Sequence, residues 1–160
     1  MYSPQIKHIC ENNAHLKHLF RGVYCLDELP IILQANSIYI LNTACTHSGG
    51  RHWVLLFCSP TGRCTYFDSL GVGLERRAAI LRHIITFNDR NYMASNLVLQ
   101  SDDSQYCGWF AIYVALKLSQ GLDFHRVIQD LYDLDTRHND YLIVRLCHVE
   151  GLNTEREYWV

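Results

Sequence analysis

Runs of apolar residues along the chain follow two spacings, and each spacing predicts one type of element. Short runs rich in β-branched and aromatic residues, bounded by turn residues, predict buried strands. Apolar residues spaced three and four apart predict helices with one buried face. The pattern thus predicts strands at 37–42, 53–58, 64–68 and 97–100. It predicts helices at 6–20, 74–85, 109–118, 124–131 and 141–149.

The two strands at 53–58 and 64–68 are joined by Ser59-Pro60-Thr61-Gly62, a sequence that suits a tight turn. They are therefore expected to form a β-hairpin. With the turn centred between Pro60 and Gly62, the numbers of paired residues should sum to about 120 to 124. His52 and Asp68 sum to 120, so we expect them to be close neighbours. A carboxylate at one ring nitrogen would fix the histidine tautomer and make it a better base.

A thiol stands at the start of the most apolar predicted helix. The polar turn 101–106 leads into Cys107, and residues 109–118 are apolar almost all round, as in a central buried helix. A helix N-terminus favours the thiolate, which is the nucleophilic form of cysteine. If Gln100 lies beside this helix start, its side-chain amide and the backbone N–H of Cys107 could together stabilise an oxyanion. The set His52, Asp68, Gln100 and Cys107 predicts acyl transfer by a cysteine nucleophile.

The order of elements predicts an α+β fold, with a small central mixed sheet packed by helices. A chain of 160 residues is long enough for one core and short for two, so residues 1–160 are expected to form a single domain. The net charge of −2 gives no general attraction to nucleic acid or anionic membranes. Seven scattered cysteines suit a reducing compartment. No apolar leader or membrane span is evident, so neither secretion nor a membrane partner is expected.

Each feature also has a structural interpretation. Cys107 could be a core thiol, and Asp68 could belong to an ordinary turn. A zinc site is conceivable at Cys10, His15, His18 and Cys25, but no close cysteine pair accompanies them, and we expect no metal. Basic residues of the predicted helix at 74–85 could contact nucleic acid, although such a face is usually solvated. They are Arg76, Arg77, Arg82 and His83.

The sequence resembles the adenovirus-type cysteine protease, adenain. The similar motifs are Gly49-Gly50-Arg51-His52-Trp53, Tyr66-Phe67-Asp68-Ser69-Leu70-Gly71, Gln100, Cys107-Gly108-Trp109-Phe110, and segments at 20–24, 41–44 and 141–152. The resemblance implies a papain-like cysteine protease in circularly permuted order. It gives Cys107 as nucleophile, His52 as general base, Asp68 as orienting acid and Gln100 as oxyanion donor.

The resemblance also implies substrates, partners and a location. The substrates would be viral precursor proteins of the capsid or core, cleaved after glycine during virion maturation. From the residues themselves we expect Gly49, Gly50, Trp53 and Gly108 to line a narrow substrate cleft, although a role in a flexible loop explains Gly49 and Gly50 equally well. We expect a monomer that acts in the virion and in the nucleus or cytoplasm of the host cell.

Three departures from that family keep alternatives open. Aspartate at position 68, where adenoviral enzymes often have glutamate, is typical of the related enzymes that remove ubiquitin-like modifiers. A deconjugase or an acyltransferase would use the same thiol. The family implies peptide and DNA activators, but residues 88–100 contain no cysteine to tether a peptide, and the net charge of −2 disfavours DNA. We therefore expect no cofactor. An inactive interaction module is the non-enzymatic alternative.

Overall fold

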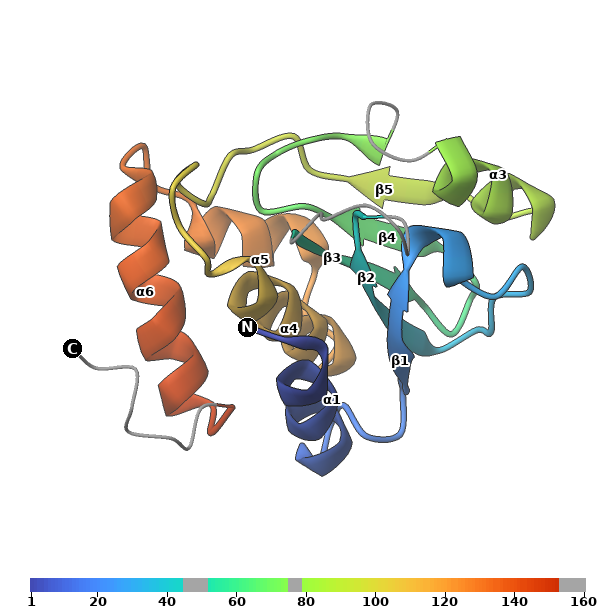
Figure 1. The fold of residues 1–160 in the computed structure, drawn as a ribbon, viewed down its shortest axis with the longest axis horizontal. Helices are drawn as coiled ribbons and strands as arrows, with labels where there is room; N and C mark the ends of the chain where they lie inside the picture. The colour runs from blue at the N-terminus through green and yellow to red at the C-terminus, as the bar shows by residue number, and fades with distance from the viewer. Residues whose placement is uncertain (45–51, 75–78, 153–160) are drawn as a thin grey trace.

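A five-stranded mixed sheet lies at the centre of the computed structural model, which describes residues 1–44, 52–74 and 79–152 (Figure 1). The strands follow one another across the sheet in chain order. The outer pairs, β1 with β2 and β4 with β5, are parallel, and the two inner pairs are antiparallel. The bounds are β1 Phe20–Cys25, β2 Ser37–Asn42, β3 Trp53–Cys58, β4 Cys64–Phe67 and β5 Tyr92–Ala94.

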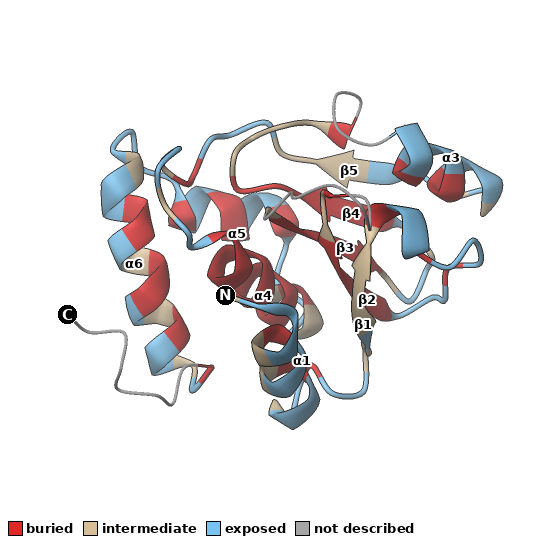
Figure 2. Cartoon of the chain, in the orientation of Figure 1, coloured by how far each residue is buried: buried red, intermediate tan, exposed pale blue. Residues whose placement is uncertain are grey.

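Helices cover both faces of this sheet, which gives the small mixed sheet packed by helices that the sequence predicts. They are α1 Ser3–Asn12, the 3-10 turn η1 Leu26–Glu28, α3 Ala79–Phe87, α4 Cys107–Ser119, α5 Phe124–Leu131 and α6 Thr136–Val149. One face packs on α4, with α1, α5 and α6 around it, and the other packs on α3 and η1. The central strands are therefore buried on both sides, which explains their continuous apolar runs (Figure 2).

The hairpin of β3 and β4 has the register that the turn predicts. Leu55 pairs with Phe67 and Cys58 with Cys64, so paired numbers sum to 122. Gly62 lies in this turn and has a φ of +85°. The Cys58 and Cys64 sulfurs lie 3.4 Å apart as free thiols. This register brings the start of β3 beside the end of β4, where His52 and Asp68 lie.

The helix predicted over 6–20 is wrong at its C-terminal half. α1 spans Ser3–Asn12, and the side chain of Asn13 then accepts the backbone N–H groups of His15 and Leu16. That local hydrogen bonding replaces the next helical turn. The chain enters β1 at Phe20, a strand that the apolar pattern did not predict because it is only partly buried at the sheet edge.

The strand predicted at 97–100 is also wrong, because β5 is formed earlier, at Tyr92–Ala94. Residues 97–100 are irregular, and the backbone N–H groups of Leu99 and Gln100 both donate to the carbonyl of Ser69.

The helix predicted at 141–149 begins at Thr136, because Asp135 caps it by accepting the N–H of Arg137. The helices predicted at 109–118 and 124–131 are confirmed as α4 and α5. The helix predicted at 74–85 is seen as α3, with residues 75–78 outside the described residues.

Gly71 closes the turn that follows β4, and we expect Gly71→Ala to be strongly destabilising. Its φ of +66° disfavours any side chain, and an added Cβ would lie 2.8 Å from the carbonyl oxygen of Asn96. We expect a loss of more than about 1 kcal/mol in the free energy of unfolding. Gly121→Ala is the matched control, because Gly121 has a φ of +83° but open space around its Cβ position. Equal losses in urea unfolding would contradict the close approach at Gly71.

Candidate active site

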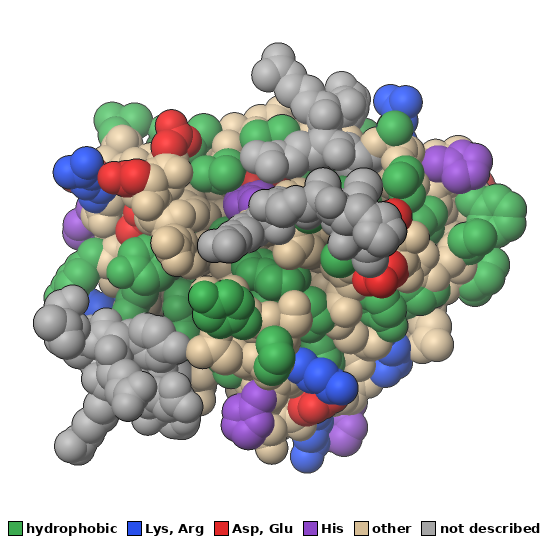
Figure 3. Space-filling model, viewed as in Figure 1, with side chains coloured by type: hydrophobic (Ala, Val, Ile, Leu, Met, Phe, Trp, Pro, Cys, Tyr) green, Lys and Arg blue, Asp and Glu red, His purple; other side chains and the backbone are tan. Residues whose placement is uncertain are grey.

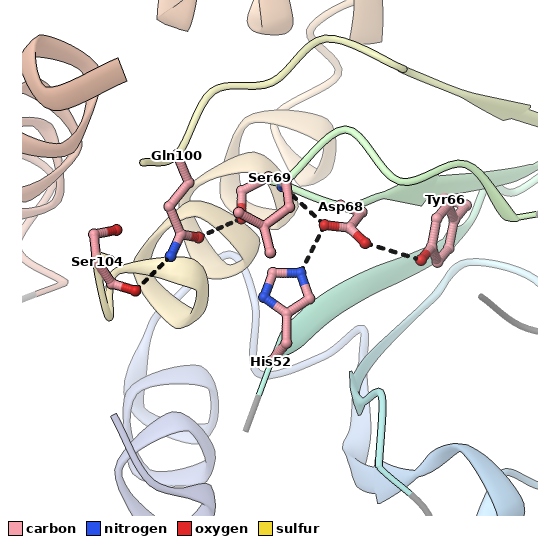
Figure 4. A network of polar contacts seen from close by, with 7 residues as sticks. His52, Tyr66, Asp68, Ser69, Gln100 and Ser104 are labelled. Atoms are coloured by element: carbon pink, nitrogen blue, oxygen red, sulfur yellow. Dashed lines mark hydrogen bonds and ion pairs between the residues drawn. The ribbon is translucent and has the colours of Figure 1, made fainter. Parts of the chain in front are cut away.

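His52 and Asp68 are brought together at one end of the hairpin, as the sequence predicts. His52 directly precedes β3 and Asp68 directly follows β4. The His52 Nε2 atom lies 2.6 Å from Oδ1 of Asp68 (Figure 4). Asp68 is fully buried, and the imidazole is 12% exposed. A buried carboxylate at Nε2 holds the ring in one orientation, with Nδ1 as the other nitrogen available for proton transfer.

The Asp68 carboxylate is itself held by neighbouring donors. Oδ1 also accepts the backbone N–H of Leu70 at 2.9 Å, and Oδ2 receives the hydroxyl of Tyr66 at 3.5 Å. The first contact closes a turn directly after β4, as an aspartate side chain often does. The structural and catalytic interpretations of Asp68 are therefore compatible: the turn fixes the carboxylate at the position where the imidazole meets it.

Cys107 is the first residue of α4 and is 5% exposed. Its sulfur interacts with the His52 imidazole and with the backbone of Trp53 and Gly108. Burial raises the pKa of the Cys107 thiol, but these hydrogen bonds and the His52 charge lower it by more, so the pKa lies below its usual value. The position at a helix start adds in the same direction. The fold thus joins Cys107, His52 and Asp68 in one chain of contacts.

The same contacts act on the imidazole in the opposite sense. Burial lowers the pKa of His52, whereas the hydrogen bonds to Asp68 and Cys107 and the charges of both groups raise it, to about 9. A thiol with a lowered pKa beside an imidazole with a raised pKa favours the thiolate–imidazolium pair over the neutral thiol–imidazole pair. The two groups titrate as a coupled system.

We expect the rate of peptide hydrolysis to follow a bell-shaped pH profile. It should rise as the Cys107 thiol loses its proton, below the usual cysteine pKa, and fall near pH 9 as His52 loses its proton, because the imidazolium protonates the leaving amine. Measuring kcat/KM from pH 4 to about 10.5 would test this. The raised pKa of His52 depends partly on the Asp68 charge, so Asp68→Asn should move the alkaline limb to lower pH. An unmoved limb would contradict that dependence.

Gln100 is buried near the start of α4, although it lies on an irregular segment and not at the end of a strand. Its Oε1 accepts the hydroxyl of Ser69 at 2.7 Å, and its Nε2 donates to the carbonyl of Ser104 at 2.9 Å (Figure 4). The following loop is anchored on α6, where the Asp140 carboxylate accepts the N–H and the hydroxyl of Ser101. The side-chain amide therefore has a fixed orientation, whatever its chemical role.

The overall arrangement of helices and strands is shared with a solved protease. The crystal structure of the ASFV pS273R protease superposes on 88% of this chain, with a TM-score of 0.55 and 14% sequence identity. The chain has the fold of that protease. It spans 64% of the length of the solved chain. The selenomethionine form of the same protease gives a TM-score of 0.42 at 17% identity, over 65% of this chain and 41% of that one. No family model matches the sequence, and no curated protein matches it.

Of the residues predicted to line a substrate cleft, Trp53 and Gly108 both contact Met1. The Trp53 indole donates to the Met1 carbonyl at 3.1 Å, and the Met1 sulfur lies 2.8 Å from where a Cβ on Gly108 would stand. The space beside the thiol that the sequence assigns to substrate is thus partly filled by the chain itself. Gly49 and Gly50 lie outside the described residues.

A cleft of about 840 Å³ opens beside the start of α4, and the sequence did not predict it. Its walls come from the loop before Cys107, from α4 and from α6, and include Met1, Ser104, Tyr106, Trp109, Arg137 and Tyr141. These segments are far apart in the sequence, and no local sequence motif contains them all. The cleft could therefore not be predicted before the fold was known. The residues that line this cleft do not include Cys107 or His52, so it borders the segment before the helix and not the reactive pair itself.

Metal, membrane and nucleic-acid interactions, none of which the sequence analysis favours, can each be compared with the described residues. No group of three His, Cys, Asp or Glu side chains there is arranged to hold a metal ion. None of the helices described is both long and apolar enough to span a membrane. On the face seen in Figure 3, lysine and arginine side chains lie in separate places, several next to acidic ones. Of the four basic residues considered for nucleic acid, Arg76 and Arg77 lie outside the described residues.

Proposed function

We propose that this protein is a cysteine endopeptidase. The proposal depends on one observation: the Cys107 sulfur at the start of a buried helix meets an imidazole whose far nitrogen is 2.6 Å from the buried Asp68 carboxylate. That is the arrangement of nucleophile, base and orienting acid used in acyl transfer. The fold shared with the ASFV pS273R protease supports the same function.

In this mechanism the Cys107 thiolate attacks the carbonyl carbon of the scissile peptide bond. The resulting oxyanion is stabilised by the backbone N–H of Cys107 and by Nε2 of Gln100. The His52 imidazolium gives its proton to the leaving amine, which departs and leaves a thioester on Cys107. His52 then takes a proton from water, and the hydroxide attacks the thioester carbonyl. The C–S bond breaks, which releases the carboxylic acid product and regenerates the Cys107 thiolate beside the His52 imidazolium.

The substrates we propose are viral precursor proteins of the capsid or core, cleaved after glycine during virion maturation, as in adenain. The enzyme would act in the virion and in the nucleus or cytoplasm of the host cell. The low exposure of Cys107, 5%, supports a glycine before the cleaved bond, because a residue without a side chain can approach a recessed thiol most closely.

The test is covalent labelling by a short peptide vinyl sulfone ending in glycine, followed by mass spectrometry of the intact and digested protein. We expect one adduct, on Cys107. Cys147 is the internal comparison: burial raises the pKa of its thiol, so it should stay unlabelled. Labelling of another cysteine, or no cleavage of any glycine-containing peptide by the unmodified protein, would refute the proposal and favour an inactive interaction module.

Removal of ubiquitin-like modifiers is the second candidate, and aspartate at position 68 is the observation that favours it. The same thiol would cleave the bond after the modifier's terminal glycine. Assays with modifier-linked substrates beside viral precursor peptides would separate the two functions. Much faster turnover of the modifier-linked substrates would replace the first proposal with the second.

A further inference from the structure

Ser69 lies next to Asp68 in the turn after β4, and its side chain leads to a different part of the site. Ser69 is fully buried, and its hydroxyl donates to Oε1 of Gln100 at 2.7 Å (Figure 4). Its carbonyl accepts the backbone N–H groups of Leu99 and Gln100 at 2.8 and 3.0 Å. One turn therefore contacts His52 through Asp68 and holds Gln100 through Ser69.

These contacts determine which way the Gln100 amide faces. The Ser104 carbonyl can only accept a hydrogen bond, so the group 2.9 Å from it must be the amide nitrogen. The amide oxygen then faces Ser69, whose hydroxyl supplies the matching donor. An amide nitrogen carries two hydrogens, and only one is used by Ser104. The second is the hydrogen that an oxyanion would require.

We propose that Ser69 is a positioning residue that keeps the amide nitrogen of Gln100 available for the oxyanion. The inference rests on the proposed acyl transfer. Without the Ser69 hydroxyl, Oε1 of Gln100 loses its donor in a buried place, and the amide can rotate away from its fixed orientation. Losing one oxyanion donor lowers kcat about 100- to 1,000-fold in a serine protease. Because Gln100 is still present, Ser69→Ala should lower kcat for peptide acylation by about 10-fold or more, with KM little changed.

Two electrophiles separate positioning of the oxyanion donor from a general structural role. Acylation by a peptide ester forms a tetrahedral oxyanion, whereas alkylation by iodoacetamide displaces iodide and forms none. Ser69→Ala should therefore slow acylation but leave both the rate and the pH profile of Cys107 alkylation unchanged. A parallel loss in both reactions would show that the variant disturbs the Cys107–His52 pair, and would overturn the proposal.

Ser37→Ala is the matched control. Ser37 is also fully buried and donates its hydroxyl, to the carbonyl of Gln34 at 2.6 Å, but it pairs with Cys58 at the end of β3 far from His52. It should lose comparable stability and keep full acylation. A loss of acylation in Ser37→Ala equal to that in Ser69→Ala would count against a specific role for Ser69.

A double-mutant cycle with Gln100→Ala completes the test. If Ser69 acts through Gln100, then Ser69→Ala should cause no further loss of acylation once Gln100 is alanine. Additive losses would overturn the proposal. The same assays distinguish failure of the proposed function from failure of the role of Ser69. Absence of acylation in the unmodified protein refutes the proposed function, whereas normal acylation in Ser69→Ala refutes only the role of Ser69.

Discussion

Cys107→Ala should abolish peptide hydrolysis and leave the fold intact. Removing a nucleophile lowers turnover by as much as about a million-fold in a well-studied protease, so we expect a loss of at least about 10⁴-fold here. Alanine suits the buried start of α4, because it is a good helix former and the side chain shrinks by one sulfur. The measurement is kcat/KM for a glycine-containing peptide, with circular dichroism and thermal unfolding to verify folding.

Cys10→Ala serves as the control for loss of a buried thiol. Cys10 is fully buried in α1, and burial raises the pKa of its thiol to about 12, so it has no nucleophilic role at neutral pH. This variant should lose some stability from the core but keep its activity. Residual hydrolysis by Cys107→Ala at more than a small fraction of the normal rate would place the nucleophile elsewhere.

The contact between His52 and Asp68 could be predicted from the sequence because it depends on local geometry. A tight turn at Pro60 to Gly62 fixes the register of two adjacent strands, and the register places residues sixteen apart in contact. The position of Cys107 at a helix start could also be predicted from local sequence, because a polar turn is followed there by an apolar run. The catalytic roles of these residues stay predictions until they are measured.

Contacts between distant segments could not be predicted in the same way. The hydrogen bond between Ser69 and Gln100 joins residues 31 apart, and no periodicity in the sequence marks it. The contact of Met1 with Trp53 spans 52 residues. The strand β1 was missed for another reason: a partly buried edge strand lacks the strict apolar alternation by which strands are recognised.

Two adjacent residues of the turn after β4 explain how this small fold assembles its site. Asp68 reaches the imidazole from the hairpin, and Ser69 reaches the amide of the segment before α4. Because Asp68 and Ser69 are consecutive residues, this turn holds the imidazole of His52 and the amide of Gln100 at a fixed position relative to each other. Gly71 closes the same turn with a positive φ that disfavours a side chain, so Gly71→Ala should impair catalysis as well as stability.

His52→Ala should be the second most damaging change, with a loss of at least about 10³-fold in kcat/KM at neutral pH. His52 has two roles in the proposed mechanism. Its positive charge and hydrogen bond lower the pKa of the Cys107 thiol against the opposing effect of burial, and its proton goes to the leaving amine. Without it, the pKa of Cys107 should rise, so the midpoint of iodoacetamide alkylation should move to higher pH.

The two roles separate at alkaline pH. Raising the pH supplies the thiolate directly, so alkylation of His52→Ala should recover, whereas hydrolysis should stay low because no acid protonates the leaving amine. His8→Ala, at an exposed position of α1, should behave as the unmodified protein in both assays. An unchanged alkylation midpoint in His52→Ala would mean that the helix start and its backbone N–H groups alone stabilise the thiolate. Full recovery of hydrolysis at high pH would mean that another group supplies the proton.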